Sequence, residues 1–203
     1  MIVALISGRG SNLQALLDAG LPVGAVISNR ADAQGLARAA ARGIPTRVIE
    51  HGRFATREAF DAELAREIDA HRPRGVALAG FMRIFTPGFV ERYRGRLLNI
   101  HPSLLPAFGG LDTHRRALEA GVKLHGCTVH FVTPQLDQGP IVIQAALPVR
   151  GDDTAETLAA RVLRLEHAIY PRAVRWLLEE RLVIEGGLVR VQGDDAQLVF
   201  SAD

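Results

Sequence analysis

The amino-acid sequence predicts an α/β fold built on an open, doubly wound and mostly parallel sheet of the Rossmann-like kind. One observation is a set of short runs that are apolar throughout, such as 2–6 and 75–80, because strands of parallel sheets are buried on both faces. Another is that stretches with helical spacing of apolar residues alternate with these runs over the first half of the chain. Strands that alternate with helices assemble into a parallel sheet covered by helices on both faces.

The first half of the chain is expected to contain strands and helices in strict alternation. The expected strands are 2–6, 23–27, 47–49, 75–80 and 97–100. The first expected helix follows the turn 7–12, and the second spans 31–42. The third opens at Thr56 and ends before Pro73, and Thr86-Pro87 starts a short fourth helix. Gly43 and Pro73 end the second and third of these helices, because neither residue continues an α-helix well.

The second half is expected to add an antiparallel hairpin and a long helix. The expected elements are a helix over 113–120, strands over 125–132 and 141–147, a helix over 154–180, and strands over 182–184 and 188–191. Turn residues are dense over 133–140, and Pro171 is expected to kink the long helix. Gly186-Gly187 sits at the centre of a small terminal hairpin. No repeat or linker interrupts the chain, so we expect one domain over residues 1–203.

Composition narrows the function classes. Of the 203 residues, 48% are hydrophobic and 23% are charged, which supplies a sizeable core and excludes disorder. The net charge is only +2 with both signs interleaved, so no basic face for nucleic acid is expected. Cys127 is the single cysteine, which excludes an intrachain disulfide and a cysteine metal cluster. No apolar run reaches the ~20 residues of a membrane span, and 2–6 is too short for a signal peptide, so we expect a cytoplasmic protein.

The most informative stretch is 97–106, Leu-Leu-Asn-Ile-His-Pro-Ser-Leu-Leu-Pro. Asn99 and His101 are two residues apart, so their side chains point to the same side of an extended segment that the prolines end. An amide dipole beside an imidazole that titrates near neutrality suits proton-coupled chemistry. A strand edge with a surface histidine accounts for the same residues, and this stretch alone favours neither interpretation.

A glycine turn over 7–12, Ser-Gly-Arg-Gly-Ser-Asn, joins the first strand to the first helix. Backbone N–H groups at a helix N-terminus are unpaired and carry positive partial charge, so Gly10, Ser11 and Asn12 suit a phosphate. The third glycine of a dinucleotide fingerprint is missing, which favours one phosphate group over a dinucleotide. A tight turn capped by Ser11 or Asn12 is the alternative.

Four further features each leave two interpretations open. The loop 81–85 follows the carboxyl end of a strand, where it either lines a flat aromatic ligand or plugs the core. Arg57, in the first turn of a helix, opposes the helix dipole and is either solvated or paired with an anion. Asp137 is either a local cap in its turn or a partner of His101. Glu166 is either a surface charge or a residue that faces a ligand.

Taken together, these motifs resemble the phosphoribosylglycinamide formyltransferases, folate-dependent enzymes of purine synthesis. The segments that carry the resemblance are, in chain order, Ser7 to Asn12, Ala79 to Ile84, Asn99 to Pro106, Leu136 to Gly139 and Glu166 to Pro171. The resemblance extends from the first strand to about residue 180. It implies the formyltransferase fold, with a phosphate-binding half over about 1–95 and a catalytic and folate-binding half over about 96–203. Asp112 stands where some relatives have histidine, and the loop 107–112 does not align.

The resemblance implies transfer of a formyl group from 10-formyltetrahydrofolate, the co-substrate, to the amine of glycinamide ribonucleotide. It implies catalytic roles for Asn99, His101 and Asp137. It assigns the substrate phosphate to Gly10, Ser11 and Asn12, and the ribose to Glu166. It assigns the folate to Arg57, Met82, Arg83, Ile84, Phe85 and Asn99. Small molecules are the expected partners, without nucleic acid or membrane, and the oligomeric state is open between a monomer and a homodimer.

The chemistry of these residues fits that reaction. A neutral amine attacks the formyl carbon, and the developing oxyanion is stabilised by donors already in place, the Asn99 amide and a His101 imidazolium. An Asp137 carboxylate near His101 favours the charged ring and orients a water that moves the amine proton to the leaving nitrogen. No side-chain set has a familiar metal spacing, so no metal is expected. The alternatives are a formyltetrahydrofolate hydrolase, a methionyl-tRNA formyltransferase, and a non-catalytic folate- or nucleotide-binding module.

Overall fold

The computed structural model describes residues 1–202 and divides the chain into two compact units. Unit 1 is Met1–Asn99, and unit 2 comprises the residues from Ile100 onward. The boundary falls inside strand β5 (Leu97–His101). The prediction of one domain over 1–203 stays a prediction, and its last residue, Asp203, lies outside the described residues.

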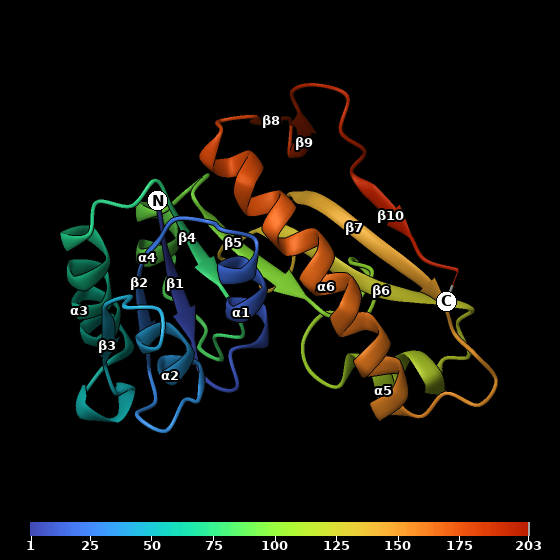
Figure 1. Ribbon diagram of the computed structural model, residues 1–203, viewed down its shortest axis with the longest axis horizontal. Coiled ribbons are helices and arrows are strands. Elements are labelled where there is room, and N and C mark those ends of the chain that lie inside the picture. Colours follow the sequence, from blue (N-terminus) through green and yellow to red (C-terminus); the bar gives the residue numbers. More distant parts are fainter. Residues whose placement is uncertain (203) are drawn as a thin grey trace. The chain divides into compact units, whose positions relative to one another are not determined.

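Unit 1 contains a parallel sheet whose strands are buried and apolar except at one edge, where the three residues of Thr46–Val48 are exposed. The strands are β1 (Ile2–Ile6), β2 (Val23–Ser28), β3 (Thr46–Val48), β4 (Gly75–Leu78) and the first three residues of β5. β1 pairs in parallel with β2 and with β4, while β3 and β5 extend the sheet on the two sides (Figure 1). Every residue of β1 is fully buried, which explains why its sequence lacks polar alternation. Because all pairings are parallel, the carboxyl ends of these strands meet at one edge.

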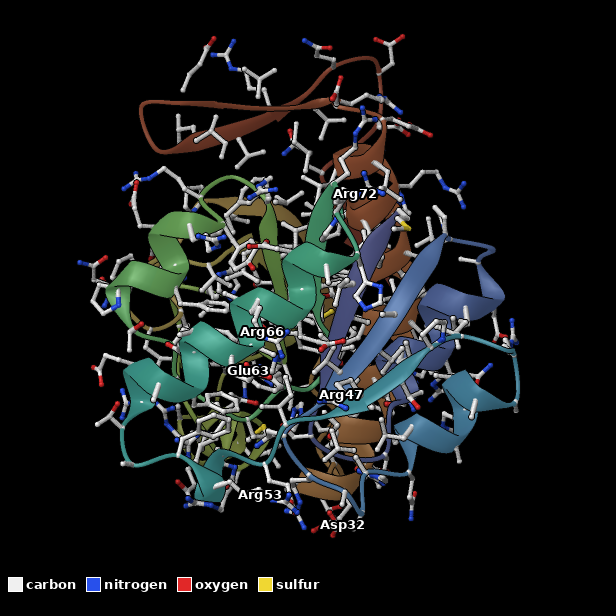
Figure 2. The ribbon with its side chains drawn as sticks, turned by 90° about the vertical axis from the view of Figure 1, so that its left-hand side faces the viewer. Asp32, Arg47, Arg53, Glu63, Arg66 and Arg72 are labelled. Carbon is white, nitrogen blue, oxygen red and sulfur yellow. The ribbon has the colours of Figure 1, made fainter. Side chains whose placement is uncertain are left out.

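Helices cover both faces of this sheet. They are α1 (Ser11–Asp18), α2 (Gly35–Ala40), α3 (Arg57–Ala70) and α4 (Pro87–Arg92), with a short 3-10 helix, η1 (His51–Arg53). α1 contacts α2 on one face and α3 contacts α4 on the other, with the ion pair of Glu63 and Arg66 on the outer side of α3 (Figure 2). Thr56 and Thr86 begin α3 and α4 by accepting a backbone N–H of the first turn.

α2 is shorter than the sequence predicted. Its expected span was 31–42, but residues 31–34 form turns and the helix begins at Gly35. The cause is local competition for hydrogen bonds, because the Ser28 hydroxyl bonds to the N–H and the carbonyl of Arg30. The Arg30 guanidinium also pairs with the Asp32 carboxylate. Side-chain bonds of this kind hold residues 28–32 in a turn rather than in a helix.

Unit 2 is built on an antiparallel strand pair and one long helix. β6 (Leu124–Phe131) pairs antiparallel with β7 (Ile141–Pro148), and β10 (Leu198–Phe200) pairs in parallel with β7. α6 (Ala155–Leu178) packs on β6 and β7 and contacts α5 (Thr113–Glu119). β8 (Leu182–Glu185) and β9 (Leu188–Val191) form the terminal hairpin. Pro171 lies inside α6 without ending it. β10 was not predicted, because three residues display no readable periodicity.

These elements confirm the predicted fold class. The doubly wound parallel sheet is unit 1, and the antiparallel hairpin with the long helix is unit 2. Among residues 1–202, no helix combines the length and the apolar character that crossing a membrane requires.

Candidate active site

His101 and Asp137 come together in unit 2. His101 is the last residue of β5, and Asp137 lies in the turn between β6 and β7. The Nδ1 atom of His101 is 3.5 Å from the Oδ2 atom of Asp137, and the two side chains are 7% and 8% exposed. The hairpin therefore carries the carboxylate to the imidazole, which favours the interpretation of Asp137 as the partner of His101 over that of a local cap.

A loop after β5 holds both members of this pair through its backbone. The Nε2 atom of His101 is 3.1 Å from the carbonyl oxygen of Phe108, and a carbonyl only accepts, so Nε2 carries the hydrogen. The N–H of Gly110 donates to Asp137 Oδ2 over 2.8 Å. Both nitrogens of His101 thus face acceptor oxygens. Sequence reasoning missed Phe108 and Gly110, and the Gly109-Gly110 pair was the only signal available.

His130 is a further polar residue on the same carboxylate that sequence reasoning missed. It lies in β6 with its Nδ1 atom 2.9 Å from the carbonyl oxygen of Phe131 and its Nε2 atom 3.8 Å from Asp137 Oδ1. Burial lowers the pKa of His130, since a charged ring would lose its hydration. Because Nδ1 donates to the Phe131 carbonyl, the ring turns its Nε2 edge towards Asp137. Its place in an apolar strand was the signal that could have found it.

A second histidine pair lies in unit 2, between α5 and β6. His114 Nδ1 is 3.1 Å from His125 Nε2, and the two rings meet edge to face. Burial lowers the pKa of His125 to about 4, and the charges of His114 and His101 act in the same direction. Burial also lowers the pKa of His114. Among residues 1–202, no group of three or more histidine, cysteine, aspartate or glutamate side chains is arranged to hold a metal ion.

Asn99 and the glycine turn lie at the same sheet edge in unit 1. Leu5 of β1 pairs with Leu78 of β4, and Leu78 pairs with Asn99 of β5. Asn99 is therefore level with the end of β1, where the turn begins. Along β5 it is two residues before His101, as the sequence indicated.

The glycine turn begins α1 without help from a side chain. Gly10, in the left-handed conformation with φ 72° and ψ 33°, is the N-cap, and no side-chain hydrogen bond caps the helix. The alternative of a Ser11 or Asn12 cap is therefore wrong. No acidic residue stands in the first turn, so the positive end of the helix is not compensated from within that turn.

Ser7 connects the glycine turn to its neighbours in unit 1. Its hydroxyl donates to Asn29 Oδ1 over 2.6 Å and accepts the N–H of Met82 over 2.8 Å. Its own N–H donates to the carbonyl of Gly80. The start of the glycine turn and the start of the loop 81–85 are thus held side by side by one buried serine. Sequence reasoning gave Ser7 no role of its own.

The loop 81–85 buries its aromatic side chains and exposes the apolar side chains between them. The rings of Phe81 and Phe85 are stacked with centroids 5.3 Å apart, and Phe85 stacks in turn on Phe89 at 4.3 Å. Both phenylalanines are buried, whereas Met82 and Ile84 are 65% and 55% exposed. The loop therefore plugs the core with its aromatic residues and leaves Met82 and Ile84 exposed, and its role in lining a ligand stays a prediction.

Arg57 and Glu166 lie on separate units. Arg57 is the exposed first residue of α3, the helix that follows the carboxyl end of β3. Glu166 lies on α6 and is 8% exposed, so it is not a surface charge. Burial, and after it the charge of Glu166, raises the pKa of the Cys127 thiol on β6. Cys127 accordingly remains a protonated, buried residue.

Comparison with known proteins identifies the family. Residues 1–174 match the family described as formyl transferase. Phosphoribosylglycinamide formyltransferase of Escherichia coli (strain K12) is 54% identical over 187 residues, covering 89% of this chain and 88% of that protein.

Solved structures give the same result. Glycinamide ribonucleotide transformylase 1 from Symbiobacterium toebii has a TM-score of 0.91 and 50% identity, covering 94% of this chain and 92% of that one. A formyltetrahydrofolate deformylase from Pseudomonas syringae pv. tomato str. DC3000 has a TM-score of 0.86 and 30% identity, covering 94% of this chain but 65% of that one. The resemblance that five sequence motifs carried is thereby confirmed. The chain belongs to the formyl transferase family and is similar over most of its length to phosphoribosylglycinamide formyltransferases.

Proposed function

We propose that this protein transfers a formyl group from 10-formyltetrahydrofolate to the primary amine of glycinamide ribonucleotide in purine biosynthesis. The observation that carries the proposal is the buried pair of His101 and Asp137, at 3.5 Å, in a chain 54% identical to a phosphoribosylglycinamide formyltransferase. An imidazole with a carboxylate beside it is suited to charge that develops and protons that move during acyl transfer.

The proposed chemistry is direct attack without a covalent enzyme intermediate. The amine nitrogen bonds to the formyl carbon, the electron pair moves to the formyl oxygen, and the bond to folate N10 breaks as this oxyanion collapses. The Asn99 amide and the Nε2–H of His101 donate to the oxyanion. That hydrogen now lies against the Phe108 carbonyl, which the formyl oxygen replaces as acceptor. Asp137 holds a water that takes the amine proton and delivers it to N10.

The substrate groups have separate proposed sites. Gly10, Ser11 and Asn12 bind the phosphate of the ribonucleotide, and Glu166 binds the ribose. Support for the phosphate site is the N-terminus of α1, which has a left-handed glycine as its cap and no side-chain cap. A phosphate there supplies the negative charge that the helix end lacks.

The folate is proposed to contact Arg57, Met82, Arg83, Ile84, Phe85 and Asn99. Met82 and Ile84 are exposed apolar side chains on a loop at the carboxyl edge of the unit 1 sheet, and a flat ring system covers such surface favourably. Arg57 is an exposed cation suited to a carboxylate of the folate. Direct attack by an amine uses only these organic groups, so we assign no metal to the reaction.

One assay separates this proposal from its nearest alternative. The chain also resembles a formyltetrahydrofolate deformylase, of which it spans 65%. Absorbance of the folate is followed as 10-formyltetrahydrofolate is mixed with the protein, with and without glycinamide ribonucleotide. Loss of the formyl group only when the amine is present supports the transferase. Equal loss without the amine identifies a hydrolase, and no loss in either case, with the folate still bound, identifies a non-catalytic binding protein.

A further inference from the structure

α2 donates hydrogen bonds to two successive backbone carbonyls of the glycine turn. The N–H of Gly35 donates to the carbonyl oxygen of Gly8 over 3.1 Å. The Nε atom of Arg38, one turn further along α2, donates to the carbonyl oxygen of Arg9 over 3.0 Å. α1 and α2 lie side by side in unit 1 (Figure 1), and these bonds connect α2 to the chain immediately before α1.

The two bonds fix the direction in which the turn presents its N–H groups. In a trans peptide the C=O and the N–H point in opposite directions. A carbonyl of Gly8 directed at α2 therefore directs the N–H of Arg9 away from it, and the carbonyl of Arg9 does the same for the N–H of Gly10. Gly10 is left-handed and is followed by helical residues, a backbone pattern that gathers successive N–H groups around an anion.

Close contact between two glycines makes this arrangement possible. A Cβ on Gly35 would lie 2.6 Å from Ile6 Cδ1 and 3.1 Å from the Cα of Gly10. A Cβ on Gly10 would lie 2.6 Å from the Cα of Gly35. The start of α2 rests on the backbone of the turn with no side chain between, so the N–H of Gly35 reaches the Gly8 carbonyl.

We propose that Arg38 and Gly35 are positioning residues for the phosphate-binding turn, acting through the carbonyls of Arg9 and Gly8. This rests on the proposed function, because it concerns the turn that binds the ribonucleotide phosphate. Arg38 also donates from Nη1 to Oε1 of Gln14 over 3.4 Å, but the positioning role belongs to Nε, the atom that bonds to the turn, and the charge of Arg38 is secondary. Arg38 is exposed, so its removal leaves the core of unit 1 intact.

The chain offers a matched control in the same helix pair. Arg42 donates from Nη1 to the carbonyl oxygen of Leu17 over 3.1 Å and pairs with Asp18. It makes the same kind of guanidinium-to-backbone contact from the α2 side to α1, but at the opposite end of α1 from the turn. Arg42→Ala therefore removes a comparable bond without touching the carbonyls of the turn.

The experiment compares Arg38→Ala, Arg38→Gln and Arg42→Ala in the full chain. Glutamine places an N–H donor, Nε2, the same number of bonds from Cα as the Nε of arginine, while removing the charge. We expect Arg38→Ala to raise the KM for glycinamide ribonucleotide about three- to tenfold, as loss of one oriented hydrogen bond does. The kcat and the KM for the folate stay unchanged, and Arg38→Gln stays within about twofold of the original protein in all three constants.

Three results would overturn the proposal. An unchanged KM for the ribonucleotide in Arg38→Ala removes the positioning role. If Arg42→Ala raises that KM as much as Arg38→Ala does, the cause is a general loosening of the contact between α1 and α2. An Arg38→Gln protein as impaired as Arg38→Ala shows that the effect comes from the charge of the guanidinium or from its Nη1 bond to Gln14, with no role for the bond to Arg9.

A second measurement does not depend on the transfer reaction. Inorganic phosphate is titrated against the melting temperature of each protein, since a ligand of the folded state raises it. We expect phosphate to stabilise the original protein, Arg38→Gln and Arg42→Ala with similar affinity. Arg38→Ala should bind phosphate at least threefold more weakly. That pattern in a protein without transferase activity would refute the proposed function and keep the positioning role. Equal stabilisation of Arg38→Ala, or none of the original protein, refutes the positioning role.

Discussion

The glycine turn of unit 1 and the histidine–carboxylate pair of unit 2 present opposite kinds of groups at the two proposed binding sites. In unit 1 the groups offered are backbone N–H groups, and a side chain, Arg38, holds the backbone from behind. In unit 2 the groups offered are side chains, and the backbone of Phe108 and Gly110 holds them. The difference teaches where each region is vulnerable. The turn depends on glycines and on bonds to its carbonyls, whereas the pair depends on the identity of its own side chains.

The largest effect is expected in unit 2, on the reaction rate. His101→Ala removes one of the two proposed oxyanion donors, which costs about 3 kcal/mol of barrier, a hundredfold or more in kcat. The fold is expected to persist, because the neighbouring residues of β5 stay buried and paired. The measurement is kcat at saturating substrates beside the melting temperature, with His71→Ala at the end of α3 as the control. A change in kcat of less than tenfold would take His101 out of the chemistry.

Buried histidines of unit 2 also make stability depend on pH. The pKa of His125 is about 4 in the folded protein, lowered first by burial and then by the charges of His114 and His101. In the unfolded chain this histidine binds a proton below about pH 6.5, so its contribution to the free energy of unfolding is fully present above that value. Stability is then lost as the pH falls from about 6.5 towards 4, by about 3 kcal/mol for this residue.

Urea unfolding between pH 7.5 and 4.5 measures that slope. His125→Gln cannot titrate, so its free energy of unfolding should decline less steeply over the same range. The buried His114 and His130, whose pKa values are also lowered by burial, leave part of the slope in place. Identical slopes for the two proteins would contradict the assignment of a depressed pKa to His125.

Unit 1 should instead respond to a change at a glycine. Gly10→Ala places a side chain on a residue with φ 72° and brings its Cβ to 2.6 Å from Gly35 Cα. Gly20 has φ 68° and no atom within 4 Å of its Cβ, so Gly20→Ala carries the same backbone strain without the collision. Gly20→Ala is expected to lose about 1 kcal/mol of stability with an unchanged KM for the ribonucleotide. Gly10→Ala should lose more stability and raise that KM at least tenfold. Equal behaviour of the two variants would mean that contact with α2 does not shape the turn.

The regular parts of both regions could be predicted from sequence because they depend on local patterns. The apolar runs of β1 and β4 are buried on both faces, and that is the property by which they were recognised. That the side chains of Asn99 and His101 point to the same side of one strand could be predicted from their spacing alone. That Asp137 reaches His101 could be stated only as a condition, since a turn residue carries no record of what lies opposite the turn.

The contacts that hold the two regions could not be predicted from the sequence, and the reason is physical. Phe108 and Gly110 act through backbone atoms, which every residue has, so no residue type marks them. Phe108 even adopts φ 55°, a conformation that its bulky side chain gave no reason to expect. The late start of α2 likewise depends on Ser28 bonding to Arg30 in place of a helical bond. Helix propensity over 31–34 could not register that competition.

The smallest effects on stability and on KM are expected from substitutions at two helix N-termini within unit 1. α3 is capped by the Thr56 hydroxyl, which accepts the N–H of Ala59 over 3.1 Å, whereas α1 has no side-chain cap. Thr56→Ala should therefore cost about 1 kcal/mol of stability and leave the KM for the ribonucleotide unchanged. Ser11→Ala and Asn12→Ala should do the reverse, raising that KM about fivefold while the KM for the folate stays the same. The backbone N–H groups remain in these variants, so binding weakens without being abolished. If Ser11→Ala and Asn12→Ala weakened both substrates equally, the N-terminus of α1 would not be the phosphate site, because a phosphate contact distinguishes the ribonucleotide from the folate.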